Sequence, residues 1–535
     1  MGTVGDFGVG TKHSGFRAIR HSDGEFNYNQ EVEVEDSQTA YRDFWIRSMS
    51  GTANQLGPIM FTLEPSKDWY AMLHTARLET TFHLVKGDGS KCNELTDVVA
   101  PVNLLGAVMF ESVEPTLNGH PMSGASCVNC GLKAFIDAML SYDKDAAESH
   151  MLTQFLHMDT PGHYDNMLLA VPTMKRIFRD LVKKHEIQLG VPIPDNCKDL
   201  PADAVKPDGS PYTPFEREKE NGVRMVRQNK FVDEHFYRAM GISPERQQAM
   251  LTGDMMNQGI NKGFETRSRL VAGSREVTLF SPIPHDLFNM NNHLGPMNRL
   301  DIKLTMYPPR FLLNTYMHFK GYKIVIDDMK LHMRAVKRKE NIPIPLKEIY
   351  RMNETHLMKH VVPAGLFTYS FRMLNTGILP KTIILGTIST SAVEGNYGSN
   401  PFNFHHFNLR KVSLSVNGEE RPSGGMEYDF ERPSANTARG YHSLFANTGA
   451  LAGSRGNLVS LPHFQAGCFL QAFDLNPDLC NGAHLHNGEY GYIDVNFVWA
   501  HELAHPITIV YEFVYNRVLV NEKTHGTVTV LDVAV

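Results

Sequence analysis

Alternating apolar and polar residues dominate two long parts of the chain. The alternation predicts strands between residues 69 and 122, with a tight turn at 87–90, and again from residue 275 onward. After a basic, proline-containing linker at 337–345, further strand candidates cover residues 365–374, 380–390, 410–418, 466–475, 490–499 and 507–520. Gly, Pro and Asn separate these short runs, and this arrangement predicts a β-sandwich or barrel.

The period becomes helical between about residues 131 and 262. Phe135, Met139 and Tyr142 form one stripe, and a second runs from Tyr164 to Leu181, where Pro172 is expected to kink or split the helix. The proline-dense stretch 191–214 is expected to be irregular, and the charged stretch 215–240 favours helix. We therefore predict a partly helical insertion in a β domain, whereas the Gly- and Asn-rich residues 1–40 are expected to form a flexible arm.

A short repeat links the two β-rich parts. ESVEPTLNGHPMSG begins at Glu111 and KVSLSVNGEERPSG at Lys411, and each carries an Asn-Gly pair, Asn118-Gly119 and Asn417-Gly418. Asn-Gly after an alternating strand is a hairpin signal because both residues tolerate positive φ. The repeat predicts that the two Asn-Gly pairs end equivalent strands of two similar domains.

Composition excludes several classes of protein. Of 535 residues 42% are hydrophobic and 21% charged, as in a folded globular protein, and the net charge of −6 gives no bulk attraction for nucleic-acid phosphates. The longest apolar stretch, Val98 to Phe110, is shorter than the ~20 residues of a membrane span. Six cysteines and an N-terminus without signal-peptide features indicate an intracellular, reducing setting.

One motif fits a metal site. His501-Glu502-Leu503-Ala504-His505 matches H-E-x-x-H, in which a helix presents two zinc-binding imidazoles with the glutamate as general base. The flanking residues alternate as strands, and Pro506 disfavours helix at His505. We interpret the motif as a loop between two strands, and keep a zinc site at His501, Glu502 and His505 as the alternative.

Other chemistry-bearing residues carry weaker signals. Cys127-Val-Asn-Cys130 is a lone C-x-x-C, and His405-His406 is a pair without a third ligand in the sequence nearby, so both are interpreted as structural. The sequence contains no P-loop, no G-x-G-x-x-G and no G-x-S-x-G. We therefore predict no catalytic residues, no cofactor and no bound metal.

The order and spacing of five segments resemble a known family. They are PVNLLGAVMFESVEPTLNG (from Pro101), SPIPHDLFNMNNHLGPMNRLDIKL (from Ser281), NPFNFHHFNLRKVSLSVNGEERP (from Asn400), AFDLNPD (from Ala472) and ITIVYEFVYNRVLV (from Ile507). In this order they resemble the double jelly-roll major capsid proteins of double-stranded DNA viruses and of Maverick or Polinton elements. The resemblance covers about residues 69–519 and is poorest in the proline-rich insertion.

The resemblance implies a mainly β fold of two tandem eight-stranded antiparallel jelly rolls. We expect the first roll at 41–340, with the insertion at about 156–263, and the second at 341–535. The implied function is a structural capsid subunit whose homotrimers form six-lobed, pseudo-hexameric capsomers of an icosahedral shell around a double-stranded DNA genome. Implied partners are neighbouring capsomers, penton and minor capsid proteins and, in some relatives, an internal membrane; no sequence-specific nucleic-acid binding is expected. The protein would assemble inside the host cell and reside in the virion.

Two further hypotheses come from other classes. A zinc-dependent hydrolase would use His501, Glu502 and His505, and stoichiometric zinc in the pure protein would favour it. A jelly-roll carbohydrate-binding or spike protein would use the same sandwich, because such folds also host lectins.

Overall fold

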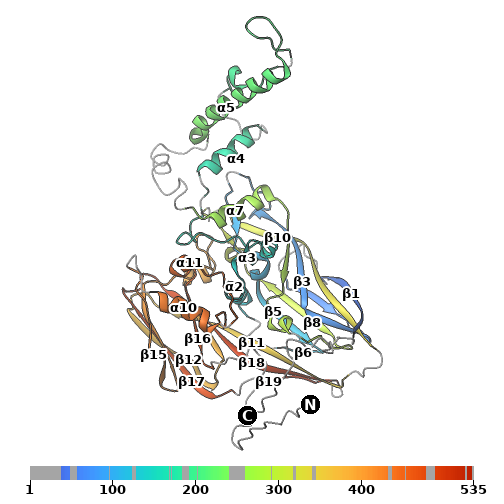
Figure 1. Ribbon diagram of the computed structural model, residues 1–535, viewed down its shortest axis with the longest axis vertical. Helices are drawn as coiled ribbons and strands as arrows, with labels where there is room; N and C mark the ends of the chain where they lie inside the picture. The colour runs from blue at the N-terminus through green and yellow to red at the C-terminus, as the bar shows by residue number, and fades with distance from the viewer. Residues whose placement is uncertain are drawn as a thin grey trace, which may run out of the picture.

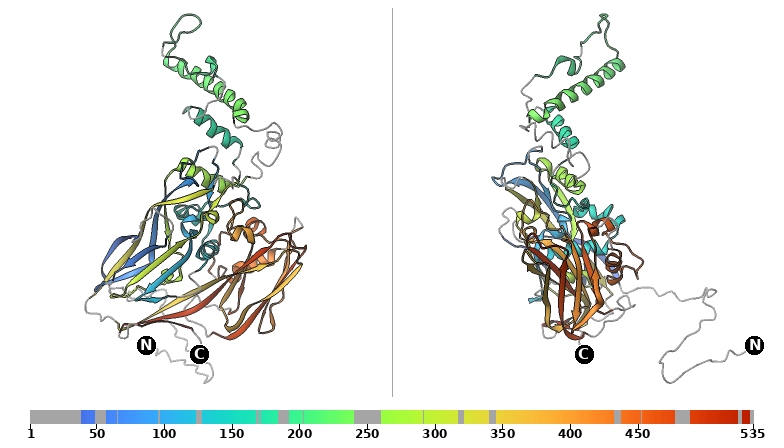
Figure 2. Two further views of the ribbon diagram at one scale, coloured as in Figure 1. Left: turned by 180° about the vertical axis from the view of Figure 1, so that it is seen from behind. Right: turned by 90° about the vertical axis from the view of Figure 1, so that its left-hand side faces the viewer.

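The computed structural model describes residues 38–48, 57–64, 66–94, 97–122, 128–167, 169, 171–183, 192–201, 203–239, 260–290, 292–316, 321–339, 345–431, 437–451, 453–476, 488–523 and 527–532. Two β-sandwiches lie side by side, and a helical segment extends from one end of the first (Figures 1 and 2). The expected arm at 1–40 lies outside these residues up to residue 37, and residues 38–40 are strand and not part of an arm.

Two four-stranded antiparallel sheets form the first sandwich. One sheet has the order β1-β10-β3-β7 and the other β2-β8-β5-β6. The strands are β1 (Gln38–Arg47), β2 (Ile59–Leu63), β3 (Trp69–Lys86), β5 (Phe110–Leu117), β6 (His120–Pro121), β7 (Val277–Pro282), β8 (Leu300–Met306) and β10 (Tyr322–Arg338). The alternation seen in the sequence is the alternation of burial: in β8, Leu300, Ile302 and Leu304 are buried and the residues between them are not.

The second sandwich repeats this order. Its sheets are β11-β18-β13-β16, with β19 on β18, and β12-β17-β14-β15. The strands are β11 (Lys347–Val362), β12 (Thr368–Ile378), β13 (Thr382–Ser389), β14 (Leu409–Val416), β15 (Glu419–Glu427), β16 (Leu470–Asp474), β17 (Tyr490–Trp499), β18 (Ile507–Glu522) and β19 (Thr527–Asp532). In the described part of the chain, each sheet takes its strands from one side of residues 339–346.

Strand order makes the two sandwiches equivalent. Leaving out β4 (Ala100–Pro101) and β9 (Leu313–Asn314), which form a separate sheet, and the C-terminal β19, the remaining eight strands of each sandwich pair as 1-8-3-6 and 2-7-4-5 in chain order. In each sandwich the first strand therefore pairs with the eighth, the second with the seventh, the third with the sixth and the fourth with the fifth. This is the double Greek key of a jelly roll.

The Asn-Gly pairs occupy the same place in both rolls. Each joins the fourth strand to the fifth, and all four residues have positive φ, from 51° to 88°. The Asn118 side chain accepts the N–H of Arg299 at 2.9 Å, and Asn417 accepts that of Tyr492 at the same distance. The predicted equivalence of these turns is therefore confirmed.

The insertion occupies the connection between β6 and β7. It holds α2 (Cys130–Ser141), α3 (Lys144–Ala147), α4 (Val171–Lys183), α5 (Pro214–Ala239) and α7 (Lys262–Val271), and α4 and α5 extend beyond the rolls (Figure 1). The equivalent connection of the second roll, 428–469, is shorter and holds α10 (Ala438–Asn447) and α11 (Leu461–Gln465). The long excursion costs the rolls little because the closure free energy of a loop grows slowly with its length.

Two details of the helical prediction are wrong. The expected stripe from Tyr164 to Leu181 is helical only from Val171, and Pro172 lies in the first turn of α4, where its missing N–H costs nothing. The excursion from the first roll also begins well before residue 156, since α2 already belongs to it. Helix α2 is apolar on most of its surface because it packs inside the molecule and not on the projecting part.

Candidate functional site

The H-E-x-x-H motif lies in the loop between β17 and β18. Residues 500–506 are not helical, so the one-turn spacing that a zinc protease needs is not formed. His501, Glu502 and His505 are exposed, and the His501 ring lies 2.5 Å from the carboxylate of Glu431. Among the described residues no group of three or more His, Cys, Asp or Glu side chains is arranged to hold a metal ion.

The remaining candidate residues are dispersed. Cys130 is the first residue of α2 and is buried, whereas Cys127 lies outside the described residues. His405 and His406 precede β14 and stack on each other with 4.6 Å between ring centroids. No predicted candidate therefore meets another to form a catalytic constellation in the part that the structure describes.

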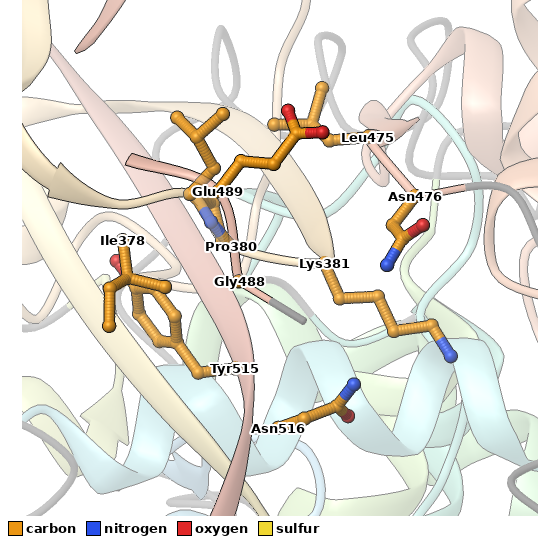
Figure 3. Close-up of a pocket in the computed structure, with 10 residues that line it drawn as sticks. Ile378, Pro380, Lys381, Leu475, Asn476, Gly488, Glu489, Tyr515 and Asn516 are labelled. Carbon is orange, nitrogen blue, oxygen red and sulfur yellow. The ribbon is translucent and has the colours of Figure 1, made fainter. Parts of the chain in front are cut away.

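A small hollow opens at the end of the second roll. Ile378 and Tyr515 lie on one side, and Lys381, Asn476 and Asn516 lie on the other (Figure 3). Beside this hollow, the N–H of Leu379 donates to the carbonyl of Glu489 and the N–H of Lys381 donates to the carbonyl of Val514, both at 2.8 Å. Within the described residues, its lining combines apolar side chains with Lys381, Asn476, Glu489 and Asn516, and contains no Ser, Cys or His side chain.

The most elaborate polar chemistry lies at the junction of the two rolls. Lys133 of α2 is buried, and its Nζ lies 2.7 Å from Asp137 and 2.9 Å from Asp286. Asp286 also accepts the backbone N–H of Thr355 in β11 at 2.8 Å, and Glu512 of β18 faces the same charges. This cluster joins the insertion, the first roll and strands β11 and β18 of the second roll.

The charges in this cluster depend on one another. Burial opposes the charge of Lys133, but the carboxylates of Asp137 and Asp286 outweigh it and hold the pKa of Lys133 well above its usual value. Burial and the carboxylate of Asp137 raise the pKa of Glu512 well above its usual value. Glu512 therefore contributes to the cluster as a neutral acid, while Lys133 remains a cation.

A second buried network joins the rolls near the Asn-Gly turn of the first. Glu348 of β11 accepts hydrogen bonds from Asn298, Tyr350 and Asn521 at 2.9–3.1 Å and pairs with Lys523 at 2.7 Å. Asn298 belongs to the first roll and the other residues to the second. Since an unpaired buried charge is costly, these partners fix the registration of the two rolls.

The base of the insertion forms a third contact with the second roll. The buried pair of Arg267 and Asp159, at 2.8 Å, lies beside Asn400, whose side chain donates to Asp159 at 3.3 Å. Asp165 accepts the backbone N–H of Asn400 and the side chain of Asn403, each at 2.6 Å. The insertion is thereby anchored to both rolls.

Aromatic packing completes the junction. Phe135 of α2 stacks on Phe402 at 4.6 Å and on Phe404 at 6.0 Å, and Phe311 meets Phe402 edge-on at 5.9 Å. These side chains belong to one continuous core cluster that includes residues of both rolls. The two rolls therefore share a core.

Sequence reasoning missed the residues of this junction. A signal existed in two places: Lys133 and Asp137 interrupt an apolar helix at i, i+4 spacing, and Glu512 interrupts the apolar run ITIVYEFVY. A charge within an apolar segment implies a buried partner. Which partner it finds depends on contacts distant in sequence, and no local pattern shows these.

Comparison with solved structures places the strand order in a known architecture. A chain in the cryo-electron microscopy structure of the Sputnik virophage matches 97% of this chain and 94% of its own length, with a TM-score of 0.54 and 10% sequence identity. The chain is a double jelly roll. The fold that the sequence predicts is therefore confirmed.

One further solved structure and one further sequence are similar to this chain. The mavirus major capsid protein matches over 97% of this chain and 96% of its own, with a TM-score of 0.48 and 10% identity. An uncharacterized protein of Caenorhabditis elegans is 25% identical over 189 residues, which are 33% of this chain and 44% of that protein. The match thus spans less than half of that relative, and no family model matches the sequence.

Within the described residues, no helix is both long enough and apolar enough to cross a bilayer.

Proposed function

We propose that this chain is the major capsid protein of a double-stranded DNA virus or related element. The observation that carries the proposal is the pair of equivalent jelly rolls held side by side by a shared core. A subunit of a shell must keep its lobes in one fixed arrangement, and the buried clusters around Lys133 and Glu348 supply that rigidity. The solved double jelly roll of the Sputnik virophage supports the same function.

The proposed assembly is a homotrimer. Two equivalent rolls in each of three chains give six similar lobes around a threefold axis, so one gene product forms a block that tiles like a hexamer. Such blocks, together with neighbouring capsomers, penton proteins and minor capsid proteins, would close an icosahedral shell around the genome. The chain would assemble inside the host cell and reside in the virion.

The insertion and the arm have separate roles in this proposal. Helices α4 and α5 extend from the end of the first roll that carries the base of the insertion (Figure 2). We place them on the outer surface of the shell or at contacts between the chains of a trimer. Residues 1–37, which precede β1, would face inward or tie neighbouring capsomers together.

The proposed role is structural and not enzymatic. The exposed loop position of His501, Glu502 and His505 supports this, because a zinc hydrolase would need them on one helical face. A capsid subunit requires no cofactor.

Mass measurement of the full chain tests the proposal. Native mass spectrometry is expected to give three times the 60.2 kDa of one chain, and electron microscopy is expected to show a six-lobed particle. The interface should exceed the ~2,000 Å² that obligate assemblies bury. A folded monomer at micromolar concentration would contradict the proposed assembly.

A further inference from the structure

A strained turn lies at the start of β14. Phe407 and Asn408 have φ of 48° and 53°, so two consecutive residues with side chains occupy the left-handed region. That region is unfavourable for a residue with a Cβ, and it is a clear outlier for phenylalanine. Such a turn persists only when its surroundings hold it in place.

Two imidazole rings hold this turn. The N–H of Phe407 donates to Nδ1 of His405, and the N–H of Asn408 donates to Nδ1 of His406, both at 2.9 Å. An imidazole nitrogen accepts a hydrogen bond only while it carries no proton, so both rings must be neutral with the proton on Nε2. The ring of His406 also stacks on Phe430, with centroids 3.8 Å apart.

The turn joins several parts of the junction. Thr387 of β13 donates its hydroxyl to the carbonyl of His405 at 2.6 Å, and the N–H of Ala500 donates to the carbonyl of Asn408 at 2.9 Å. A few residues earlier in the chain, Asn400 and Asn403 bind Asp165 at the base of the insertion. Releasing the turn would therefore loosen the start of β14 and the anchor of the insertion together.

Charged and titratable groups surround the turn on each side. The base of the insertion brings Asp165, whose charge favours protonation of His405, and further away the pair of Arg267 and Asp159. Burial nevertheless lowers the pKa of His405. Helix α11 brings His463 to Asp159, since its Nε2 lies 3.1 Å from the Asp159 carbonyl.

The His406 ring has its own set of neighbours. Burial and then His405 lower the pKa of His406 to about 3. Phe430, on which it stacks, is flanked by Asp429 and Glu431, and Glu431 pairs with His501 on the surface. The ring itself lies against the aromatic side chains of His405 and Phe430.

We propose that His405 and His406 form a proton-operated latch that releases the turn at 405–408 and loosens the junction between the insertion and the second roll when the pH falls. The regulatory meaning rests on the proposed capsid function: acidification would loosen the subunits of a shell. A proton placed on Nδ1 removes the acceptor of a backbone N–H and leaves the strained turn unsupported.

The direction with pH follows from proton linkage. A histidine whose pKa is lower in the closed turn than in the open one contributes its full stabilisation above the open-state pKa of about 6.5, and loses it as the pH falls toward the closed-state value. With a closed-state value of about 3 for His406, the turn should open roughly 50- to 100-fold more readily at pH 4.5 than at pH 7.

Hydrogen–deuterium exchange of the full chain tests the latch. Peptides covering 400–410 are followed at pH 7 and pH 4.5, and rates are corrected for the intrinsic effect of pH. The double variant His405→Asn, His406→Asn retains an acceptor oxygen near each Nδ1 position but takes up no proton. Its pH 4.5 to pH 7 ratio of opening should fall at least tenfold below that of the unmodified chain, whereas His501→Asn, on an exposed loop, should leave the ratio unchanged.

Two results would overturn the latch. One is an unmodified chain whose opening ratio stays below threefold, which needs no variant to fold. The other is a double variant, or His406→Asn alone, that keeps the full ratio. Exchange reads the turn whether the chain is a monomer or a trimer, so failure of the proposed capsid assembly would appear separately, in the native mass.

Discussion

Replacing Lys133 with methionine is expected to lower the free energy of unfolding by about 3–5 kcal/mol, the usual cost of breaking a buried ion pair by removing one partner. The Lys133 side chain is only 4% exposed, and Asp286, which it neutralises, is 6% exposed. Methionine preserves most of the side-chain volume, so the cavity contribution is small. The loss therefore reports the uncompensated charge of Asp286 in the junction between the rolls.

Urea unfolding of the full chain, followed by fluorescence and circular dichroism, measures this loss as a shift of the first transition midpoint. Lys144→Met is the matched control. Its side chain is 84% exposed and lies 3.6 Å from Glu148, so the same change should cost less than ~0.5 kcal/mol. If Lys133→Met proved as mild as Lys144→Met, the cluster would not hold the junction in the way that its geometry indicates.

The variant Glu512→Gln tests how the charge of Glu512, as opposed to the shape of its side chain, affects the free energy of unfolding. Because burial and Asp137 raise the pKa of Glu512, the folded protein favours its neutral acid, and a neutral amide of similar shape should cost within ~1 kcal/mol near pH 5, where the linkage effect is small. A carboxyl group with a raised folded pKa loses its contribution as the pH rises above the unfolded value, whereas glutamine does not. The variant should therefore gain stability relative to the unmodified protein as the pH rises above about 5, and a loss equal to that of Lys133→Met would refute this assignment.

Further changes test other parts of the molecule. Phe402→Ala should cost about 3–5 kcal/mol in urea unfolding because its fully buried ring stacks in the junction, whereas Phe367→Ala, at a half-exposed ring, should cost far less; equal losses would contradict the packing. Asn417→Ala should cost about 1–2 kcal/mol of thermal stability at the left-handed turn and Asn417→Gly less, and the reverse order would contradict the turn geometry. Ala at both His501 and His505 should leave native mass and melting temperature unchanged, and elemental analysis should find no stoichiometric zinc; loss of bound zinc together with a peptidase activity would support the hydrolase instead.

Much of the fold could be predicted from local pattern, because half-buried strands repeat every two residues. In β14, Val412, Leu414 and Val416 are buried while Ser413 and Ser415 are less so, as the alternation predicts. The Asn-Gly turn that follows could also be predicted, because its chemistry is local. The helix expected from Tyr164 failed because apolar spacing continues through a segment that contacts the second roll, so burial there reflects tertiary contact and not helical period.

The junction could not be predicted in the same way. Lys133, Asp286 and Glu512 lie far apart in the sequence, and only the packing of the two rolls brings them together. The histidine pair was visible in the sequence, but its role depends on the left-handed backbone of the next two residues. Backbone strain of this kind leaves no compositional signal, since neither phenylalanine nor asparagine is restricted to turns.

Two segments, residues 157–160 and 261–263, form the base of the insertion. They contact each other as well as the rolls. Asn261 accepts the backbone N–H of Thr160 at 3.2 Å, Thr160 accepts that of Lys262 at 3.0 Å, and a Cβ at Gly263 would come within 2.5 Å of the His157 carbonyl. If the chain were cut between these two segments, both new ends would remain attached at the base of the insertion. The segment is therefore a natural point for circular permutation or for grafting a foreign domain, because neither alteration would reach the strands below.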